Sequence, residues 1–175
     1  ISVSAEMGNA RVLSNTSCGA VITAYPPIGY HFLKWSDGNA DNPRTIQLTQ
    51  DTTLTAFFEQ SYSGQCGDNL SWAFDTTTNT LTIIGFGSMN YASSQPPWTL
   101  FRNKIDSVVL PEQLTYIAPK AFEFCRISSI NIPNAVKHIA PYAFEGCSYL
   151  TSVTIPNNVE TIQSYAFCFC SDLKK

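Results

Sequence analysis

The chain has 175 residues, of which 44% are hydrophobic and 13% are charged, and its formal net charge is −3. The hydrophobic fraction is enough for a packed core and excludes a disordered chain, while the charged fraction is about half of the ~25% usual in soluble proteins, so uncharged polar residues must cover much of the surface. Because Lys and Arg form no cluster and no apolar run approaches the ~18–20 residues that span a bilayer, the sequence predicts neither a nucleic-acid-binding surface nor a membrane-spanning segment.

Residues 1–60 show a pattern of short β-strands. Apolar residues alternate at Ile1, Val3 and Ala5 before a Gly-Asn turn, and further strands are predicted over 20–25, 30–35, 45–49 and 53–58. The stretch SYSG then interrupts the strand pattern, so we place the end of this module at residue 60.

The sequence DGNAD at 37–41 carries oxygen ligands at alternate positions, as a Ca²⁺ loop does. Such a loop needs glycine at its sixth position and glutamate at its twelfth, where this chain has Asn42 and Leu48. An Asp-Gly pair between two strands is typical of a hairpin turn, so we interpret the segment as a turn and predict no metal site.

Residues 61–102 form a second module. Leu70, Trp72 and Phe74 alternate on one predicted strand and Leu81 and Ile83 on the next, with TTTNT between them, which predicts a β-hairpin. The repeats that follow would leave core and strand edge open at their N-terminal end, so we expect the hairpin to cap them.

The same segment occurs three times in residues 103–175, as IDSVVLP (105–111), ISSINIP (127–133) and LTSVTIP (150–156). Each copy continues with a Leu or Val column, an Ile column, an Ala-Phe pair and a Cys. The repeats therefore cover 103–125, 126–147 and 148–170, and a fourth starts at 171–175. Since the chain opens at Ile1 without a start methionine and stops within the fourth repeat, we expect it to be a piece of a longer protein.

A unit of about 20–29 residues with an L-x-x-L-x-L-like strand is the signature of a leucine-rich repeat, in which one strand per coil stacks into a solenoid. The predicted inward columns are Ile105/Ile127/Leu150, Val108/Ile130/Val153 and Leu110/Ile132/Ile155. The proline after each strand lacks an N–H and ends the ladder, and the Ala-Phe pair fills the interior from the back of the coil. The predicted fold is mainly β: a small N-terminal β module followed by a capped, right-handed leucine-rich repeat solenoid.

The repeat pattern P-x-x-V-x-x-I-x-x-x-A-F-x-x-C resembles the BspA-like leucine-rich repeat family of bacterial surface proteins. The segment CGDNLSWAFDTTTNTLTIIGFGSM at 66–89, followed by Pro96-Pro97-Trp98, is similar to the segment that often precedes these repeats. The string GYHFLKWSDGNADNPRTIQLTQDTTLTAFFE at 29–59 resembles the divergent internalin-type B-repeat, which implies a β-grasp-like or sandwich-like spacer. Both resemblances imply an extracellular or cell-surface location, and the first implies adhesion or protein binding.

Cys125, Cys147 and Cys170 recur at one place in each coil, so they should stack about 4.8 Å apart. That spacing lies within the Cα range of a disulfide, but repeated buried cysteines are typical of core residues, and we favour free thiols. A line of single thiolates cannot surround a zinc ion tetrahedrally, so no metal or other cofactor is predicted. Cys18 and Cys66 stand in different modules, and whether they pair is left open.

The chain has only two histidines, His31 and His138, and they stand in different modules. A Cys–His nucleophile pair would have to join His138 to Cys125 or Cys147. Those cysteines recur in every coil, as packing requires and an active site does not, and the carboxylates are scattered along the chain. The sequence therefore favours a protein that is not an enzyme.

The outward face of the repeat strands, which we expect to be concave, is the remaining candidate for function. Its side chains lie between the inward columns and are mostly small, uncharged and hydroxyl-bearing: Asp106, Ser107, Val109, Ser128, Ser129, Asn131, Thr151, Ser152 and Thr154. Such a face can hydrogen-bond a protein strand or a glycan, for instance in a host extracellular matrix, or it can be a solvated β-face with no ligand. The sequence thus predicts an adhesion or binding protein, and the alternative is an architectural stalk that presents other domains.

Overall fold

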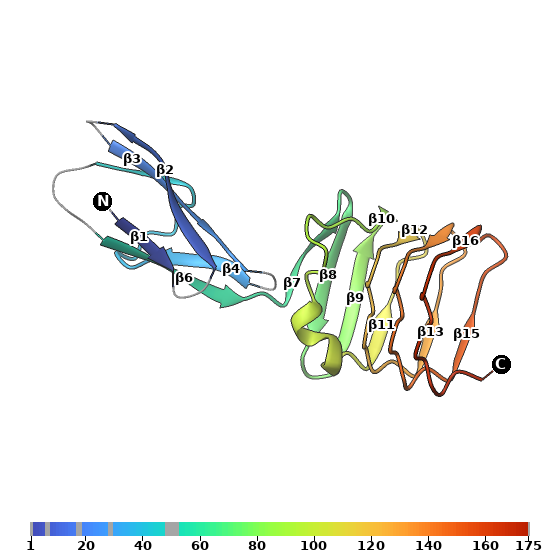
Figure 1. Cartoon of the computed structure of the whole chain (residues 1–175). Coiled ribbons are helices and arrows are strands. Elements are labelled where there is room, and N and C mark those ends of the chain that lie inside the picture. Colours follow the sequence, from blue (N-terminus) through green and yellow to red (C-terminus); the bar gives the residue numbers. More distant parts are fainter. Residues whose placement is uncertain (1, 6–7, 17–18, 28–29, 48–52, 175) are drawn as a thin grey trace. The chain divides into compact units, whose positions relative to one another are not determined.

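The computed structural model describes residues 2–5, 8–16, 19–27, 30–47 and 53–174, and the chain divides into two compact units, Ile1–Ser61 and Tyr62–Lys175 (Figure 1). Strands make up nearly all the regular structure, and the one helix among the described residues is the short 3₁₀ helix η1 (Thr99–Lys104). Within the described ranges, no helix has the length and apolar character needed to cross a membrane. The mainly β fold predicted from the sequence is confirmed.

The first unit contains two three-stranded sheets. In spatial order, their strands are β1 (Ser2–Ala5), β6 (Thr53–Gln60) and β4 (Tyr30–Trp35) in one sheet, and β2 (Asn9–Thr16), β3 (Gly19–Tyr25) and β5 (Arg44–Ile46) in the other. β1 and β6 are parallel, and the other pairs are antiparallel. The sequence pattern does not predict β2, because β2 is an edge strand and its residues NARVLSNT show no clean alternation. The sequence predicts a strand over 45–49, and in the structure β5 ends at Ile46. Residues 48 and 49 lie outside the described residues.

One core lies between these two sheets. Its buried residues are Ala20, Ile22, Ala24, Trp35, Ile46, Leu54 and Ala56, which come from β3, β4, β5 and β6. Trp35 is fully buried, and its indole Nε1 donates a hydrogen bond to the Asp41 carbonyl at 3.0 Å. Of the two arrangements that the sequence resemblance implies, the structure therefore has the sandwich-like one, and none of the described residues of this unit is helical.

The DGNAD segment forms a turn, as predicted, but not a hairpin turn, because β4 and β5 belong to different sheets. Arg44 donates to both oxygens of the Asp37 carboxylate, at 2.8 and 2.7 Å, and holds the pKa of that carboxyl below its usual value. Asn42 closes the segment onto β3: its side-chain nitrogen donates to the Ala24 carbonyl, and its side-chain oxygen accepts from the Ala24 N–H, both at 2.8 Å. The side chains of the segment thus connect the two sheets.

We expect Asn42→Ala to destabilise the first unit by about 1–3 kcal/mol, because it leaves the buried N–H and carbonyl of Ala24 without partners. Arg44→Lys is the matched control. It breaks a bidentate contact to a half-exposed carboxylate and should cost less than about 1 kcal/mol. Amide hydrogen exchange of β3 in the whole chain measures both effects, and equal protection in the two variants would contradict this account.

The second unit begins with an antiparallel meander that continues into the first repeat. Its strands are β7 (Ser63–Gly67), β8 (Leu70–Asp75) and β9 (Thr80–Gly85), and the first repeat strand, β11 (Ser107–Val109), pairs with β9 in parallel. The alternating residues of the predicted hairpin, Leu70, Trp72, Phe74, Leu81 and Ile83, are all buried. The hairpin prediction is confirmed, and the hairpin shares a sheet with the first repeat strand.

Each coil carries two short strands, whereas the sequence predicts one. The first ladder joins β13 (Ser129–Asn131) to β15 (Ser152–Thr154), and the second joins β10 (Gly87–Ser88), β12 (Leu114–Ile117), β14 (His138–Ile139) and β16 (Thr161–Ile162), all in parallel. After each first strand the chain turns at the proline, where the N–H three residues on donates to the carbonyl of Pro111, Pro133 or Pro156. The Ile column after this turn is extended and pairs with the next coil, which the leucine-rich repeat pattern alone does not reveal.

The predicted inward columns face a single core. Ile105, Ile127, Leu150, Ile130 and Ile132 are buried, and Val108, Leu110, Val153 and Ile155 are partly buried against the same core. Aromatic rings form a second column, in which Trp98, Phe122, Phe144 and Phe167 stack with successive centroid distances of 6.3, 5.2 and 5.1 Å. The Ala-Phe pair thus supplies the interior of every coil, and Trp98 occupies the place of its phenylalanine in front of the first coil.

Side chains that precede the repeats also replace missing backbone donors. In the Ala-Phe turns, the phenylalanine N–H donates to the alanine carbonyl of the next coil: Phe122 N to Ala143 O at 2.7 Å, and Phe144 N to Ala166 O at 2.8 Å. The equivalent carbonyl of the first coil, Ala121 O, accepts from the indole Nε1 of Trp98 at 2.6 Å. In the same way, the Pro141 carbonyl accepts from the Lys120 N–H, while the Pro119 carbonyl accepts from the Tyr91 hydroxyl.

We expect Trp98→Phe to lower the free energy of unfolding of the second unit by about 1–3 kcal/mol, because the ring stack survives but the Ala121 carbonyl loses its donor in a buried site. Tyr91→Phe is the matched control and should cost less, since Pro119 is exposed and water can replace the hydroxyl. Urea unfolding measures both variants, and an unchanged stability of Trp98→Phe would contradict the donor role of the indole.

Candidate functional site

The predicted ligand face is exposed in the structure. All nine residues lie on or beside β11, β13 and β15, and their side chains point away from the core: Asp106, Ser107, Val109, Ser128, Ser129, Asn131, Thr151, Ser152 and Thr154. Val109 is the one apolar member, with 49% of its surface exposed. We call this set the outward face.

The outward face is divided between two sheets. Ser129 lies opposite Ser152, and Asn131 lies opposite Thr154, across the ladder of β13 and β15. In contrast, Ser107 and Val109 of β11 have their ladder partners in β9 of the hairpin. β9, β11, β13 and β15 nevertheless follow one another side by side along the array (Figure 1).

Two members of the face, Asp106 and Thr151, bond to neighbouring segments of the fold. The Asp106 carboxylate accepts from the Asn79 side chain at 3.0 Å, and its other oxygen lies 3.6 Å from Arg126 Nε. Thr151 donates both its N–H and its hydroxyl to the Ser128 carbonyl, at 3.0 and 3.1 Å. These groups connect neighbouring coils and are less available to a ligand than the side chains of Ser129, Asn131, Ser152 and Thr154.

The face also includes residues that the sequence reasoning missed. Thr80 and Thr82 of β9 lie opposite Ser107 and Val109, and the buried Leu81 between them shows that both threonines point outward. The alternation of the hairpin already contained this information. The sequence pattern predicts the hairpin only as a cap of the repeats, so the predicted face does not include its outer side.

A second surface column, Lys120, Tyr142 and Tyr165, in which only Tyr165 is fully exposed, was also missed. All three have left-handed backbones, with φ of 59°, 61° and 61°, which costs a residue other than glycine about 1–2 kcal/mol. The Lys120 ammonium lies 5.9 Å from the centroid of the Tyr142 ring, and that ring stacks on Tyr165 at 5.3 Å with an interplanar angle of 3°. The sequence signal for this column is an aromatic residue directly before two of the three Ala-Phe pairs, Tyr142 and Tyr165. Because the rings cover one another, mainly their edges are left for a ligand.

The repeat cysteines act as core residues. The structure has Cys66, Cys125, Cys147, Cys168 and Cys170 as free thiols, and Cys18 lies outside the described residues. The Cys147 and Cys170 thiols donate to the carbonyls of the preceding coil at 3.1 and 3.2 Å. Burial raises the pKa of the Cys147 thiol to about 12 and that of Cys125 well above its ordinary value, so both stay protonated at neutral pH.

The residues of the Cys–His hypothesis have separate partners. The Cys147 thiol faces the Phe122 carbonyl, and His138 Nδ1 lies 2.9 Å from the Thr161 hydroxyl. Among the residues that the structure describes, no three His, Cys, Asp or Glu side chains lie close enough together to hold a metal ion.

Two family models match the chain. Residues 99–175 match the model described as "BspA type Leucine rich repeat region (6 copies)", and residues 2–62 match the "Divergent InlB B-repeat domain". Over these ranges the second unit is similar to BspA-type leucine-rich repeats, and the first unit is similar to divergent InlB B-repeat domains. Both resemblances noted from the sequence are confirmed.

Two solved structures are similar to the chain. One is a leucine rich cell surface protein from Faecalibacterium prausnitzii A2-165, with 16% identity and a TM-score of 0.40 over 71% of this chain and 40% of that one. The other is a leucine-rich repeat protein from Eubacterium ventriosum ATCC 27560, with 18% identity and a TM-score of 0.39 over 65% of this chain and 42% of that one. The chain thus spans about two fifths of the length of each. No curated protein matches it.

The buried thiols make stability depend on alkaline pH. An unfolded thiol loses its proton near its ordinary pKa of 9.0, whereas the folded Cys147 keeps its proton up to about 12, so stability is full below pH 9 and falls as the pH rises toward 12. The loss per thiol is at most about 1.4 kcal/mol per pH unit. We expect Cys147→Ala to flatten this decline in the melting temperature between pH 8.5 and 10.5. Cys168→Ala, at a partly exposed thiol, is the control, and equal slopes in the two variants would contradict the assignment.

Proposed function

We propose that the chain is part of a secreted or cell-surface bacterial protein that adheres to a protein or glycan ligand through the outward face. The observation that carries the proposal is the row of exposed, uncharged hydrogen-bonding side chains on neighbouring strands, above all Ser129, Asn131, Ser152 and Thr154. The pairing of a B-repeat domain with a BspA-type repeat region supports the extracellular location.

In this proposal each of the three modules has its own role. Residues 1–60 are a spacer, residues 61–102 cap the solenoid, and residues 103–175 carry the ligand face. No step of the proposed function is catalytic. Among the described residues of the repeats, the ion pairs lie at separate places, such as Arg126 with Asp106 at 3.6 Å and Lys137 with Glu160 at 3.2 Å.

A ligand would bind this face by many small contacts. Serine, threonine and asparagine side chains both donate and accept hydrogen bonds, so they match the peptide groups of an extended chain or the hydroxyls of a glycan. The face has no tryptophan, tyrosine or arginine, which are the residues that dominate tight interfaces. Affinity would therefore depend on the number of coils that contact the ligand at once.

The lack of such anchors also favours the alternative, an architectural stalk. A solvated β-face of serine and threonine keeps a solenoid soluble without binding anything. The two functions differ in one respect, because only the adhesin loses activity when the outward face is altered.

We expect the purified chain to bind at least one member of an immobilised panel of extracellular-matrix glycoproteins and glycans, and the double variant Ser129→Arg/Asn131→Glu to lose that binding by tenfold or more. Surface plasmon resonance measures both. The matched control is Gln163→Arg/Ser164→Glu, which makes the same change of charge at two exposed residues outside the face.

Loss of binding in both double variants would indicate a non-specific charge effect. Binding that the Ser129/Asn131 variant retains would contradict the proposed face. If the wild-type chain binds no member of the panel, the stalk is favoured.

A further inference from the structure

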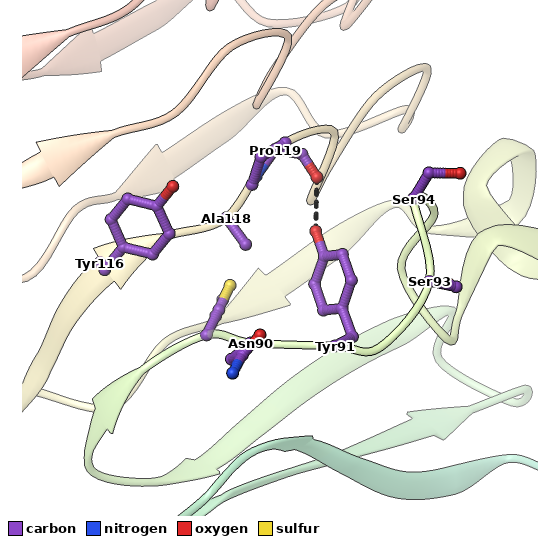
Figure 2. A pocket seen from close by; sticks show the side chains of 8 residues that line it. Asn90, Tyr91, Ser93, Ser94, Tyr116, Ala118 and Pro119 are labelled. Carbon is purple, nitrogen blue, oxygen red and sulfur yellow. Dashed lines mark hydrogen bonds between the residues drawn. The ribbon is translucent and has the colours of Figure 1, made fainter.

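A small cleft opens beside the first coil, away from the outward face. It has a volume of about 220 Å³ and lies between the segment that follows β10 and the end of β12 (Figure 2). Tyr91 and Tyr116 stand on either side, with Ala118 between them, and Ser93 and Ser94 extend the wall beyond Tyr91. None of these residues belongs to the ligand face proposed above.

The Tyr91 side chain and the backbone of Tyr116 are held in place before any ligand binds. The Tyr91 hydroxyl donates to the Pro119 carbonyl, and its ring packs edge-on against the buried Trp98 at 6.0 Å. Tyr116 lies on β12, where strand pairing with β10 and β14 fixes its backbone. The Met89 N–H donates to the Tyr116 carbonyl at 3.2 Å and ties the two walls together. The Tyr91 ring and the strand that carries Tyr116 are therefore preorganised, which reduces the entropic cost of binding.

The lining is neutral but rich in hydrogen-bonding groups. No charged side chain lines the cleft. The Tyr116 hydroxyl, the Asn90 carboxamide and the Ser94 hydroxyl form no side-chain hydrogen bond with any residue in the described part of the chain, so they are free to bind a ligand. The nearest cation in sequence, Lys120, is engaged by Glu123 at 3.8 Å and lies over the Tyr142 ring. A phosphate or carboxylate would find no counter-charge here.

The size of the cleft limits the ligand to one small ring. Sites for drug-sized ligands have volumes of about 300–1,000 Å³, and this cleft is smaller. An aromatic ring has an electron-rich face that attracts the weakly positive C–H groups of a sugar ring, while neutral hydroxyl and amide groups match sugar hydroxyls. Two tyrosines with neutral polar groups around them suit a pyranose.

We propose that this cleft binds a single uncharged pyranose residue, as a free monosaccharide unit or within a glycan chain. Tyr116 forms the stacking wall, and the Tyr116 hydroxyl, Asn90 and Ser94 orient the sugar. Beyond Tyr116 the ladder continues with His138 and Thr161, which are hydrogen-bonded to each other at 2.9 Å. This polar continuation favours a glycan over a proline-rich peptide, which needs a row of apolar grooves.

The test is saturation-transfer NMR of the whole chain with a panel of neutral methyl pyranosides, followed by titration of those that bind. We expect saturation of the ring protons of at least one pyranoside, with millimolar affinity. Tyr116→Ala should weaken binding at least tenfold, and Tyr116→Phe and Asn90→Ala should each weaken it about 2- to 10-fold, the value of one hydrogen bond. Tyr165→Ala, at an exposed tyrosine of the third coil, should bind as the wild type does.

Other results overturn the proposal. These are the absence of saturation for every pyranoside at high millimolar concentration, unchanged affinity in a folded Tyr116→Ala variant, or saturation of a proline-rich peptide in place of the sugars. Asn90 is exposed, so Asn90→Ala keeps the test decisive if Tyr116→Ala does not fold. The Ser129→Arg/Asn131→Glu variant should retain pyranoside binding, which separates this site from the outward face.

Discussion

In the Ala-Phe turns, the alanine carbonyls of the second and third coils accept from the phenylalanine N–H of the coil before them, and this direction makes a donor necessary in front of the first coil. Trp98 and Tyr91 provide it with an indole N–H and a hydroxyl, and Trp98 also begins the column of stacked rings. A polar group buried without a partner costs free energy comparable to a lost hydrogen bond. The segment that joins the hairpin to the repeats is therefore an integral part of the solenoid. It also builds one wall of the proposed pyranose cleft, so Tyr91 both supplies a donor to the first coil and lines the cleft.

Stacking disfavours a like charge that recurs in one column of the solenoid. Equivalent residues of neighbouring coils lie about 4.8 Å apart, so a charge repeated in one column faces its own copy. The column of Glu123 and Glu145 illustrates the cost. Burial, followed by the neighbouring Glu123, raises the pKa of Glu145 above its usual value, while Glu123 lies against Arg102 at 3.1 Å and Lys120 at 3.8 Å. Columns of serine and threonine avoid that repulsion, which accounts for a neutral outward face without reference to any ligand.

Much of the fold could be predicted from the sequence because its signals are periodic. The three copies of the repeat identify the inward columns, and the alternation in Leu70–Phe74 identifies the hairpin. The second strand of each coil was missed because two to four extended residues leave no alternation to count. β2 was missed because an edge strand need not alternate. The turn at 37–41 was recognised from its residues, but the sheet to which each flanking strand belongs depends on contacts between distant segments.

The candidate surfaces were predictable to different degrees. The outward face follows from the alternation of the repeat strands, and its extension to Thr80 and Thr82 follows from the register of β9 against β11. The cleft between Tyr91 and Tyr116 could not be foreseen, because it joins a segment outside the repeats to a strand that the repeat pattern does not reveal. Sequence periodicity identifies what recurs, whereas a site formed where the repeats begin occurs once.

The direction of the hydrogen bonds between coils has a mechanical consequence. These bonds connect one coil to the next along the array. A pulling force along the array therefore breaks the hydrogen bonds between one pair of coils at a time and does not shear all pairs together. A coil that detaches releases a repeat of 22 residues, which is roughly 70 Å of extended chain. An array of such coils under tension would lengthen in steps of this size, and each step would dissipate the energy of the contacts between two neighbouring coils. A solenoid built in this way is expected to lengthen by whole coils under tension.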